Sequence, residues 1–319
     1  MGLMIEGRYL ADDPAPDTDA DGAFRRARSS IRNWITPDGS PGPTGEGGFA
    51  PAPGRYHIMA AWNCPWAHRA LLTLTFKNLH GQIGVSYARP RRTDQGWVYD
   101  PDGEFADPLF GVTALHETYA RAVPPYTGRL TVPLLWDKQT DRAVSNESAD
   151  VIRMLNRRFK GGPDLCPDDL VEDIDRWNAR IYRNVNNGVY RAGFARTQAA
   201  YDAAVAEVFE TFDAIEDQLG RTRYLTGERF TEADLRLFPT LARFDVAYHY
   251  AFKCNIRRLI DYPNLWAYAR DIYQMPGVAA TVRFNVYKQG YFSPSEFRNP
   301  LGIVPAGPEI DWNEPHGRG

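Results

Sequence analysis

A cysteine followed by a proline is the part of this sequence best placed to do chemistry. Cys64 and Pro65 lie between two apolar stretches, residues 55–61 and 70–76. The first stretch is typical of a short buried strand and the second of a helix, so Cys64 is expected on a strand-to-helix turn. Pro65 suits the first turn of a helix, where its missing N–H costs nothing. Because the free N–H groups there stabilise a thiolate, the sequence predicts a cysteine nucleophile with a lowered pKa.

The neighbours of Cys64 support this interpretation, although a lone cysteine is more often a small buried hydrophobic residue. His68 and Arg69 follow within about a turn and would add positive charge. Cys166 and Cys254 are interpreted as structural or incidental, because neither precedes a helix with a comparable proline. The histidines have no metal-ligand partners at useful spacing, so no metal is expected.

Composition narrows the classes of function. The 319 residues are enough for two domains, and 43% of them are hydrophobic, which allows a substantial core. A net charge of -3 favours neither nucleic acid nor an anionic membrane as partner. Three scattered cysteines indicate neither a disulfide framework nor a zinc site. With no long apolar run and no secretory signal pattern, a soluble cytoplasmic protein is expected.

The order of predicted elements divides the chain into two domains flanked by irregular segments. Prolines and glycines recur before residue 55, a Gly-Gly-Pro linker occupies residues 161–163, and the C-terminal segment has several prolines without periodicity. The predicted parts are an N-terminal extension and loop at 1–54, an α/β domain at 55–160, an all-helical domain at 165–290 and a tail at 291–319.

In the α/β domain, strands at 55–61 and 83–87 flank the helix after Cys64 and should be parallel. A long aromatic insertion, residues 89–128, follows. The domain is completed by strands at 131–137 and 142–145 and by a helix that opens at 147–150. A proline near the start of the third strand is compatible with a cis Val132–Pro133 bond.

The second half of the chain has helical periodicity throughout. Thr231, with an acidic residue three positions later, predicts a capped helix start. The other helices are expected over residues 168–185, over 201–219 and from 262 onward.

Taken together, the motifs of this chain resemble those of cytosolic glutathione transferases, and most closely the Xi class, the glutathionyl-hydroquinone reductases. The resemblance covers roughly residues 24–294. It rests on the segments Asn63–Arg69, Asp94–Trp97, Arg129–Pro133, Asn146–Ala149, Asn186–Ala195, Arg243–Val246, Phe252–Asn255 and Tyr287–Tyr291.

The resemblance implies a thioredoxin-like N-terminal domain, an all-α C-terminal domain and a homodimer. It also implies a reaction in which glutathione is removed from a glutathionyl-hydroquinone. Cys64 would attack the glutathionyl sulfur, the hydroquinone would leave, and a second glutathione would resolve the Cys64–glutathione mixed disulfide to oxidised glutathione.

Five residues match the needs of glutathione, which has an extended backbone, two carboxylates and an ammonium. The backbone of Val132 could pair with the cysteinyl unit as an added strand. Glu147 and Ser148, at a helix start, could hold the γ-glutamyl ammonium and carboxylate. Arg129 and Trp97 could meet the remaining carboxylate and peptide. Considered without the resemblance, these residues also fit an ordinary helix start, a solvated charge and loop packing.

Three tyrosines carry the roles that the resemblance implies for the helical domain. Tyr190 would protonate the departing aryl carbon or hold the substrate hydroxyl. Tyr248 and Tyr291 would help to lower the pKa of the cysteine by O–H donation. Each of them, taken singly among 17 tyrosines, would more often be a packing residue.

Two other classes of function stay open from the residues alone. A glutathione-conjugating enzyme, or one of the dehydroascorbate-reductase or thiol-transferase type, could use the same fold. A non-enzymatic binding protein could use it as well, since fold does not determine function. The reactivity of Cys64 toward glutathione and alkylating reagents distinguishes these alternatives from the reductase.

Overall fold

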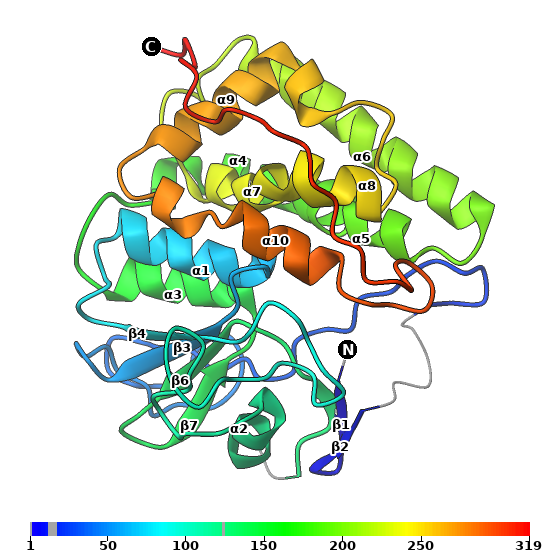
Figure 1. Cartoon of the computed structure of the whole chain (residues 1–319). Coiled ribbons are helices and arrows are strands. Elements are labelled where there is room, and N and C mark those ends of the chain that lie inside the picture. Colours follow the sequence, from blue (N-terminus) through cyan, green and yellow to red (C-terminus); the bar gives the residue numbers. More distant parts are fainter. Residues whose placement is uncertain (1, 12–17, 123–124) are drawn as a thin grey trace. The chain divides into compact units, whose positions relative to one another are not determined.

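A computed structural model of the chain describes residues 2–11, 18–122 and 125–319 (Figure 1). These residues form two compact units. The first unit contains residues 2–11 and the described part of 27–163, and the second contains residues 18–26 and 164–319. Part of the predicted N-terminal extension, residues 12–17, lies outside the described residues.

The first unit is built on a four-stranded mixed sheet with the strand order β4-β3-β6-β7. Strand β3 pairs with β4 in parallel, as expected, and with β6 antiparallel, while β6 and β7 are also antiparallel. Figure 1 shows α1 and α3 together on one side of this sheet and α2 on the other. The elements are β3 Tyr56–Ala60, α1 Pro65–Phe76, β4 Gly84–Tyr87, α2 Leu115–Ala122, β6 Leu134–Asp137, β7 Arg142–Ser145 and α3 Ser148–Arg158.

The two central strands explain why this sheet forms. All residues of β3 and of β6 are buried. A strand that is covered on both faces has a continuous apolar run rather than an alternating pattern, and this run was the signal in the sequence. The sheet with its flanking helices confirms the thioredoxin-like α/β fold class expected for this half of the chain.

A second, smaller sheet lies in segments that were expected to be irregular. Its strand order is β2-β1-β5, and its strands are β1 Leu3–Ile5, β2 Arg8–Leu10 and β5 Gly128–Arg129. The first two come from the N-terminal extension and the third from the end of the aromatic insertion. That insertion also contains α2, so it has more regular structure than its weak periodicity predicted.

The second unit is helical, and its described residues form no named strand. Its longer helices are α4 Val171–Ile181, α5 Gly188–Phe194, α6 Gln198–Leu219, α7 Glu232–Arg243, α9 Pro263–Gln274 and α10 Phe284–Tyr291; α8, His249–Ala251, is a short turn. Thr231 and Asp234 form the capping box expected at the start of α7. The all-α class predicted for this half is therefore confirmed.

Two π-helical segments interrupt this unit. The helix expected over 168–185 is the 3-10 turn η1, Asp168–Leu170, and α4, followed by the π-helix η2, Tyr182–Asn186. A second π-helix, η3, covers Phe244–Tyr248. Such widened turns are often found at functional sites. Among the helices that the structure describes, none is long and apolar enough to cross a bilayer.

Candidate active site

Cys64 occupies the turn between β3 and α1. Its backbone is extended, with φ of -84° and ψ of 118°, and it is the N-cap residue of α1. The Cys64 carbonyl accepts a hydrogen bond from His68 N at 3.0 Å, and its own N–H donates to the Ala61 carbonyl at 3.0 Å. Pro65 is the first helical residue, as expected. The sulfur is thus attached at the positive end of a helix dipole.

The sulfur of Cys64 lies beside the backbone of Val132. Cys64 Sγ donates to the Val132 carbonyl oxygen at 3.3 Å, and the residue is 8% exposed. The Val132–Pro133 peptide bond is cis, as the sequence had allowed. A peptide that paired with Val132 as an added strand would therefore bring its own side chains next to the Cys64 sulfur.

The start of α3 is the second part of the site. Glu147 is the N-cap residue, with one carboxylate oxygen accepting from Ala149 N at 3.0 Å and the other from the Ser29 hydroxyl at 3.0 Å. The Ser148 hydroxyl accepts from Arg69 Nη1 at 3.3 Å. Since Arg69 is only 1% exposed, a buried cation adds to the positive end of this helix. The arrangement favours a carboxylate ligand.

The sequence predicted positive charge from Arg69 but not its contact with Ser148. The two residues are 79 positions apart, and the contact forms because α1 and α3 pack against each other. An arginine on an otherwise apolar helix was the signal that could have indicated a special role.

Trp97 and Arg129 lie in the parts of the first unit outside the four-stranded sheet. Trp97 is buried, with the guanidinium of Arg92 at 4.4 Å from its ring centroid. Arg129 belongs to β5 and is partly exposed. Cys64 and all five residues predicted to bind glutathione therefore belong to the same unit. They can thus contribute to a single glutathione site within that unit.

In the second unit the three predicted tyrosines meet. Tyr190 comes from α5, Tyr248 from η3 and Tyr291 from α10. The hydroxyl of Tyr291 is 2.7 Å from the Tyr190 hydroxyl and 2.8 Å from the Tyr248 hydroxyl, so the three form a hydrogen-bonded chain. The ring of Phe252 contacts all three rings at centroid distances of 5.2–5.6 Å. The hydroxyl contacts join tyrosines that are up to 101 residues apart in the sequence.

A buried arginine lies behind this tyrosine chain. Arg243 ends α7, is fully buried, donates to the Pro239 carbonyl at 2.8 Å and lies 3.8 Å from the ring centroid of Tyr287. Burial raises the pKa of Tyr248 and of Tyr291 well above the ordinary value, and the charge of Arg243 only partly opposes this. The phenols are therefore protonated and available as donors throughout the neutral range.

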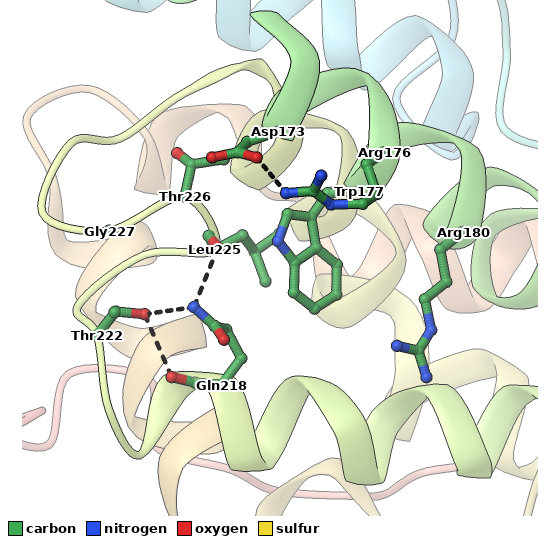
Figure 2. Close-up of a pocket in the computed structure, with 9 residues that line it drawn as sticks. All are labelled: Asp173, Arg176, Trp177, Arg180, Gln218, Thr222, Leu225, Thr226 and Gly227. Carbon is green, nitrogen blue, oxygen red and sulfur yellow. Dashed lines mark hydrogen bonds and ion pairs between the residues drawn. The ribbon is translucent and has the colours of Figure 1, made fainter. Parts of the chain in front are cut away.

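A separate pocket lies elsewhere in the second unit, on α4 and the loop after α6 (Figure 2). Its volume is about 410 Å³. Figure 2 shows the Trp177 ring and the Arg180 side chain facing this space, with Gln218 hydrogen-bonded to Thr222 and Leu225. The residues that line it include none of the predicted site residues. We therefore do not assign the predicted chemistry to this pocket.

Comparison with known proteins gives consistent matches. Two family models match, "Glutathione S-transferase, N-terminal domain" over residues 63–158 and "Glutathione S-transferase, C-terminal domain" over residues 198–271. The chain is 48% identical to the glutathionyl-hydroquinone reductase YqjG of Escherichia coli strain K12, covering 100% of this chain and 98% of that protein. It is 42% identical to the glutathionyl-hydroquinone reductase PcpF of Sphingobium chlorophenolicum, covering 97% and 96%.

Solved structures agree with these matches. The glutathione-bound structure of YqjG from Escherichia coli K-12 superposes with a TM-score of 0.88 at 48% identity, covering 90% of this chain and 96% of that chain. A Xi-class transferase from Natrialba magadii superposes with a TM-score of 0.90 at 40% identity, covering 100% and 96%.

Proposed function

Because the chain belongs to the glutathione transferase family, in its Xi class of glutathionyl-hydroquinone reductases, we propose that it uses glutathione to reduce glutathionyl-hydroquinones to hydroquinones. One observation carries this proposal beyond family membership. The Cys64 sulfur lies 3.3 Å from the carbonyl of Val132, the residue whose backbone would pair with the cysteinyl unit of glutathione. A glutathione paired in this way would have its sulfur next to Cys64, which favours attack of the Cys64 sulfur on the glutathione sulfur.

The proposed reaction has two thiol steps. The Cys64 thiolate attacks the sulfur of the glutathionyl group, a Cys64–glutathione disulfide forms, and the carbon–sulfur bond to the ring breaks. The electron pair of that bond stays on the ring carbon, which takes up a proton and becomes the C–H of the hydroquinone. A second glutathione thiolate then attacks the mixed disulfide, so that oxidised glutathione leaves and the Cys64 thiolate is regenerated.

Glutathione is proposed to bind along the first unit. Its cysteinyl backbone would pair with Val132, and its γ-glutamyl group would lie at Glu147 and Ser148, where Arg69 and the start of α3 favour a carboxylate. The Glu147 carboxylate also has lone pairs left for the ammonium, since each of its oxygens accepts only one of the hydrogen bonds described above.

The opposite end of glutathione is assigned to Arg129 and Trp97. The guanidinium would pair with the glycyl carboxylate, and the indole would contact the peptide. In this assignment residues 55–160 form the glutathione-binding domain and residues 165–290 the substrate domain.

The tyrosine chain is proposed to act on the hydroquinone. Tyr190 would donate a proton to the ring carbon or hold a ring hydroxyl, while Tyr291 and Tyr248 orient it through the hydroxyl contacts of 2.7 Å and 2.8 Å. The raised pKa values of Tyr248 and Tyr291 keep these two phenols protonated, which supports a role as donors, either to the substrate or to the Cys64 thiolate.

The oligomeric state and the cellular location are further parts of the proposal. We expect a homodimer, measurable by light scattering of the purified protein, and a cytoplasmic location. The reaction needs no metal, so chelation by EDTA should leave turnover unchanged.

The decisive test is Cys64→Ala, assayed with a glutathionyl-hydroquinone and free glutathione while oxidised glutathione is followed. We expect turnover to disappear and, in the unaltered protein, an adduct of one glutathione on Cys64 to be detected by mass spectrometry. Cys254→Ala is the matched control, because that thiol is buried in the second unit and should be dispensable. Full turnover in Cys64→Ala, or glutathione conjugation without any adduct, would refute the proposal.

A further inference from the structure

Two of the residues assigned to glutathione, Trp97 and Arg129, come from the long insertion and its end rather than from the turns next to the four-stranded sheet. Trp97 follows a turn in the long insertion, and Arg129 belongs to a strand of two residues. A turn and a very short strand do not hold a side chain in place by themselves. Contacts with other segments must therefore hold Trp97 and Arg129 in position.

The backbone of Arg129 is held by the N-terminal strand β1. In this antiparallel pair Leu3 lies opposite Arg129 and Met4 opposite Gly128, and Leu130 N donates to the Gly2 carbonyl at 3.2 Å. Strand β1 is the central strand of its sheet. Its Met4 side chain is buried, with 1% exposure, and so anchors the strand on the first unit.

The turn before Trp97 is held by the second strand of the same hairpin. The Tyr9 hydroxyl, on β2, donates to the Asp94 carbonyl at 2.7 Å. The Tyr9 ring stacks on the ring of His116 with centroids 4.3 Å apart, and His116 Nε2 lies 3.0 Å from Gln95 Oε1. Two successive residues of the turn are therefore tied to the hairpin, directly or through His116.

The turn also leaves little room for a side chain facing Tyr9. Gly96 has a φ of 75°, in the left-handed region that favours glycine. A Cβ at this position would lie 3.1 Å from the Tyr9 hydroxyl oxygen. Close approach of the turn backbone to Tyr9 is thus part of the local geometry just before Trp97.

We propose that the β1–β2 hairpin, residues 3–10, is a positioning element that sets Arg129 and Trp97 for the glycyl end of glutathione. This inference rests on the proposed function, because that function assigns the two residues to glutathione. The proposed role concerns binding of the tripeptide, so the reactivity of the Cys64 sulfur is expected to stay unchanged when the hairpin is altered.

The test uses two substitutions in the full chain. Tyr9→Phe removes the hydroxyl contact with Asp94 and keeps the ring that stacks on His116. Leu3→Pro disrupts the hairpin itself: because Leu130 N bonds to the Gly2 carbonyl, the N–H of Leu3 faces away from Arg129 and toward Leu10 of β2, and proline removes it. Tyr201→Phe is the matched control, because it removes a phenol-to-carbonyl hydrogen bond of the same length, 2.7 Å to Lys253, in the second unit.

Each protein is assayed with glutathione and with γ-glutamylcysteine, which lacks the glycyl carboxylate. We expect the KM for glutathione to rise about fivefold in Tyr9→Phe, as for the loss of one hydrogen bond, and further in Leu3→Pro. The KM for γ-glutamylcysteine, the turnover number and the rate of Cys64 alkylation by iodoacetamide should stay within twofold, as should every value in the control.

Several outcomes would overturn the inference. The hairpin has only a structural role if Tyr9→Phe leaves the KM for glutathione unchanged, or if the KM values for both thiols rise equally. Should Leu3→Pro fail to fold, Tyr9→Phe decides alone. If the unaltered protein has no turnover, the proposed function fails. The role of the hairpin is then tested by comparing the affinity of each protein for glutathione, measured by titration calorimetry. If the unaltered protein does not bind glutathione at all, both the proposed function and the role of the hairpin are refuted.

Discussion

Tyr291→Phe should destabilise the protein more than either of the matched changes Tyr190→Phe and Tyr248→Phe. Tyr291 is the middle member of the hydroxyl chain, so its loss removes both the 2.7 Å and the 2.8 Å contact. Each hydrogen bond contributes about 1 kcal/mol net, and a buried hydroxyl left without a partner costs a further ~1–3 kcal/mol. Tyr248 is fully buried, and the only hydrogen bond that its hydroxyl makes to the described residues is the one with Tyr291.

The free energy of unfolding should therefore fall by about 3–5 kcal/mol in Tyr291→Phe and by about 1 kcal/mol in each of the other two variants. Equilibrium unfolding in urea at pH 7.0 measures these differences. The double variant Tyr248→Phe with Tyr291→Phe is the critical control. This double variant also removes the Tyr248 hydroxyl, which Tyr291→Phe alone leaves buried without a partner. It should therefore be no less stable than Tyr291→Phe alone.

Two results would contradict this reasoning. One is a Tyr291→Phe protein that is as stable as the two variants at the ends of the chain. The other is a double variant whose loss equals the sum of the single losses, because additive losses would mean that the hydroxyls do not depend on each other. In activity assays Tyr190→Phe should lose turnover by roughly 10²-fold, as for removal of a positioned proton donor, with the rate of Cys64 alkylation unchanged.

Three further outcomes follow from buried groups. Burial raises the pKa of Asp234 to about 6, so its protonated carboxyl contributes stability that is fully present only below the unfolded pKa near 4 and is lost as the pH rises through 6; relative to Asp234→Asn, the unaltered protein should lose about 2.5 kcal/mol between pH 4 and pH 7 in urea titrations. Arg55→Met should cost about 3–5 kcal/mol, since it leaves the fully buried Asp137 without the guanidinium that bonds it at 2.5 and 2.8 Å. Arg142→Met should cost less than about 1 kcal/mol, because the half-exposed Arg142 pairs with the exposed Glu46; equal losses would refute this. Burial raises the pKa of the Cys254 thiol to about 12, so iodoacetamide at pH 8 should label this residue only after unfolding, and rapid labelling of the native protein would contradict its assignment as structural.

Much of the turn that carries Cys64 could be predicted from the sequence because its signals are local. An apolar strand, Cys64, Pro65 and an apolar helix occur within about twenty residues, and each signal acts over one turn or one strand. The same holds for the capping box of Thr231 and Asp234, whose partners are three residues apart. The π-helix at 182–186 was expected to be part of an ordinary helix, because the spacing of apolar residues does not distinguish an α-helix from a π-helix.

The hairpin near the N-terminus could not be predicted in this way. Its strands have three residues each, too few for a pattern, and β1 pairs with a strand more than a hundred residues later in the chain. The contact of Arg69 with Ser148 and the chain of three tyrosines likewise join distant segments. Sequence similarity indicated which tyrosines to examine, but only packing of three helices decided that their hydroxyls meet.

The amino-acid sequence alone thus determined the fold class and the turn that presents Cys64, because those depend on interactions between near neighbours, while the residues expected to bind glutathione came from the resemblance to a family. Tertiary structure alone decided which of those residues share hydrogen bonds, which charges are buried and what holds Arg129 and Trp97. The physical reason is that long-range contacts form only after strands and helices have packed, and their geometry depends on the whole unit rather than on any short segment.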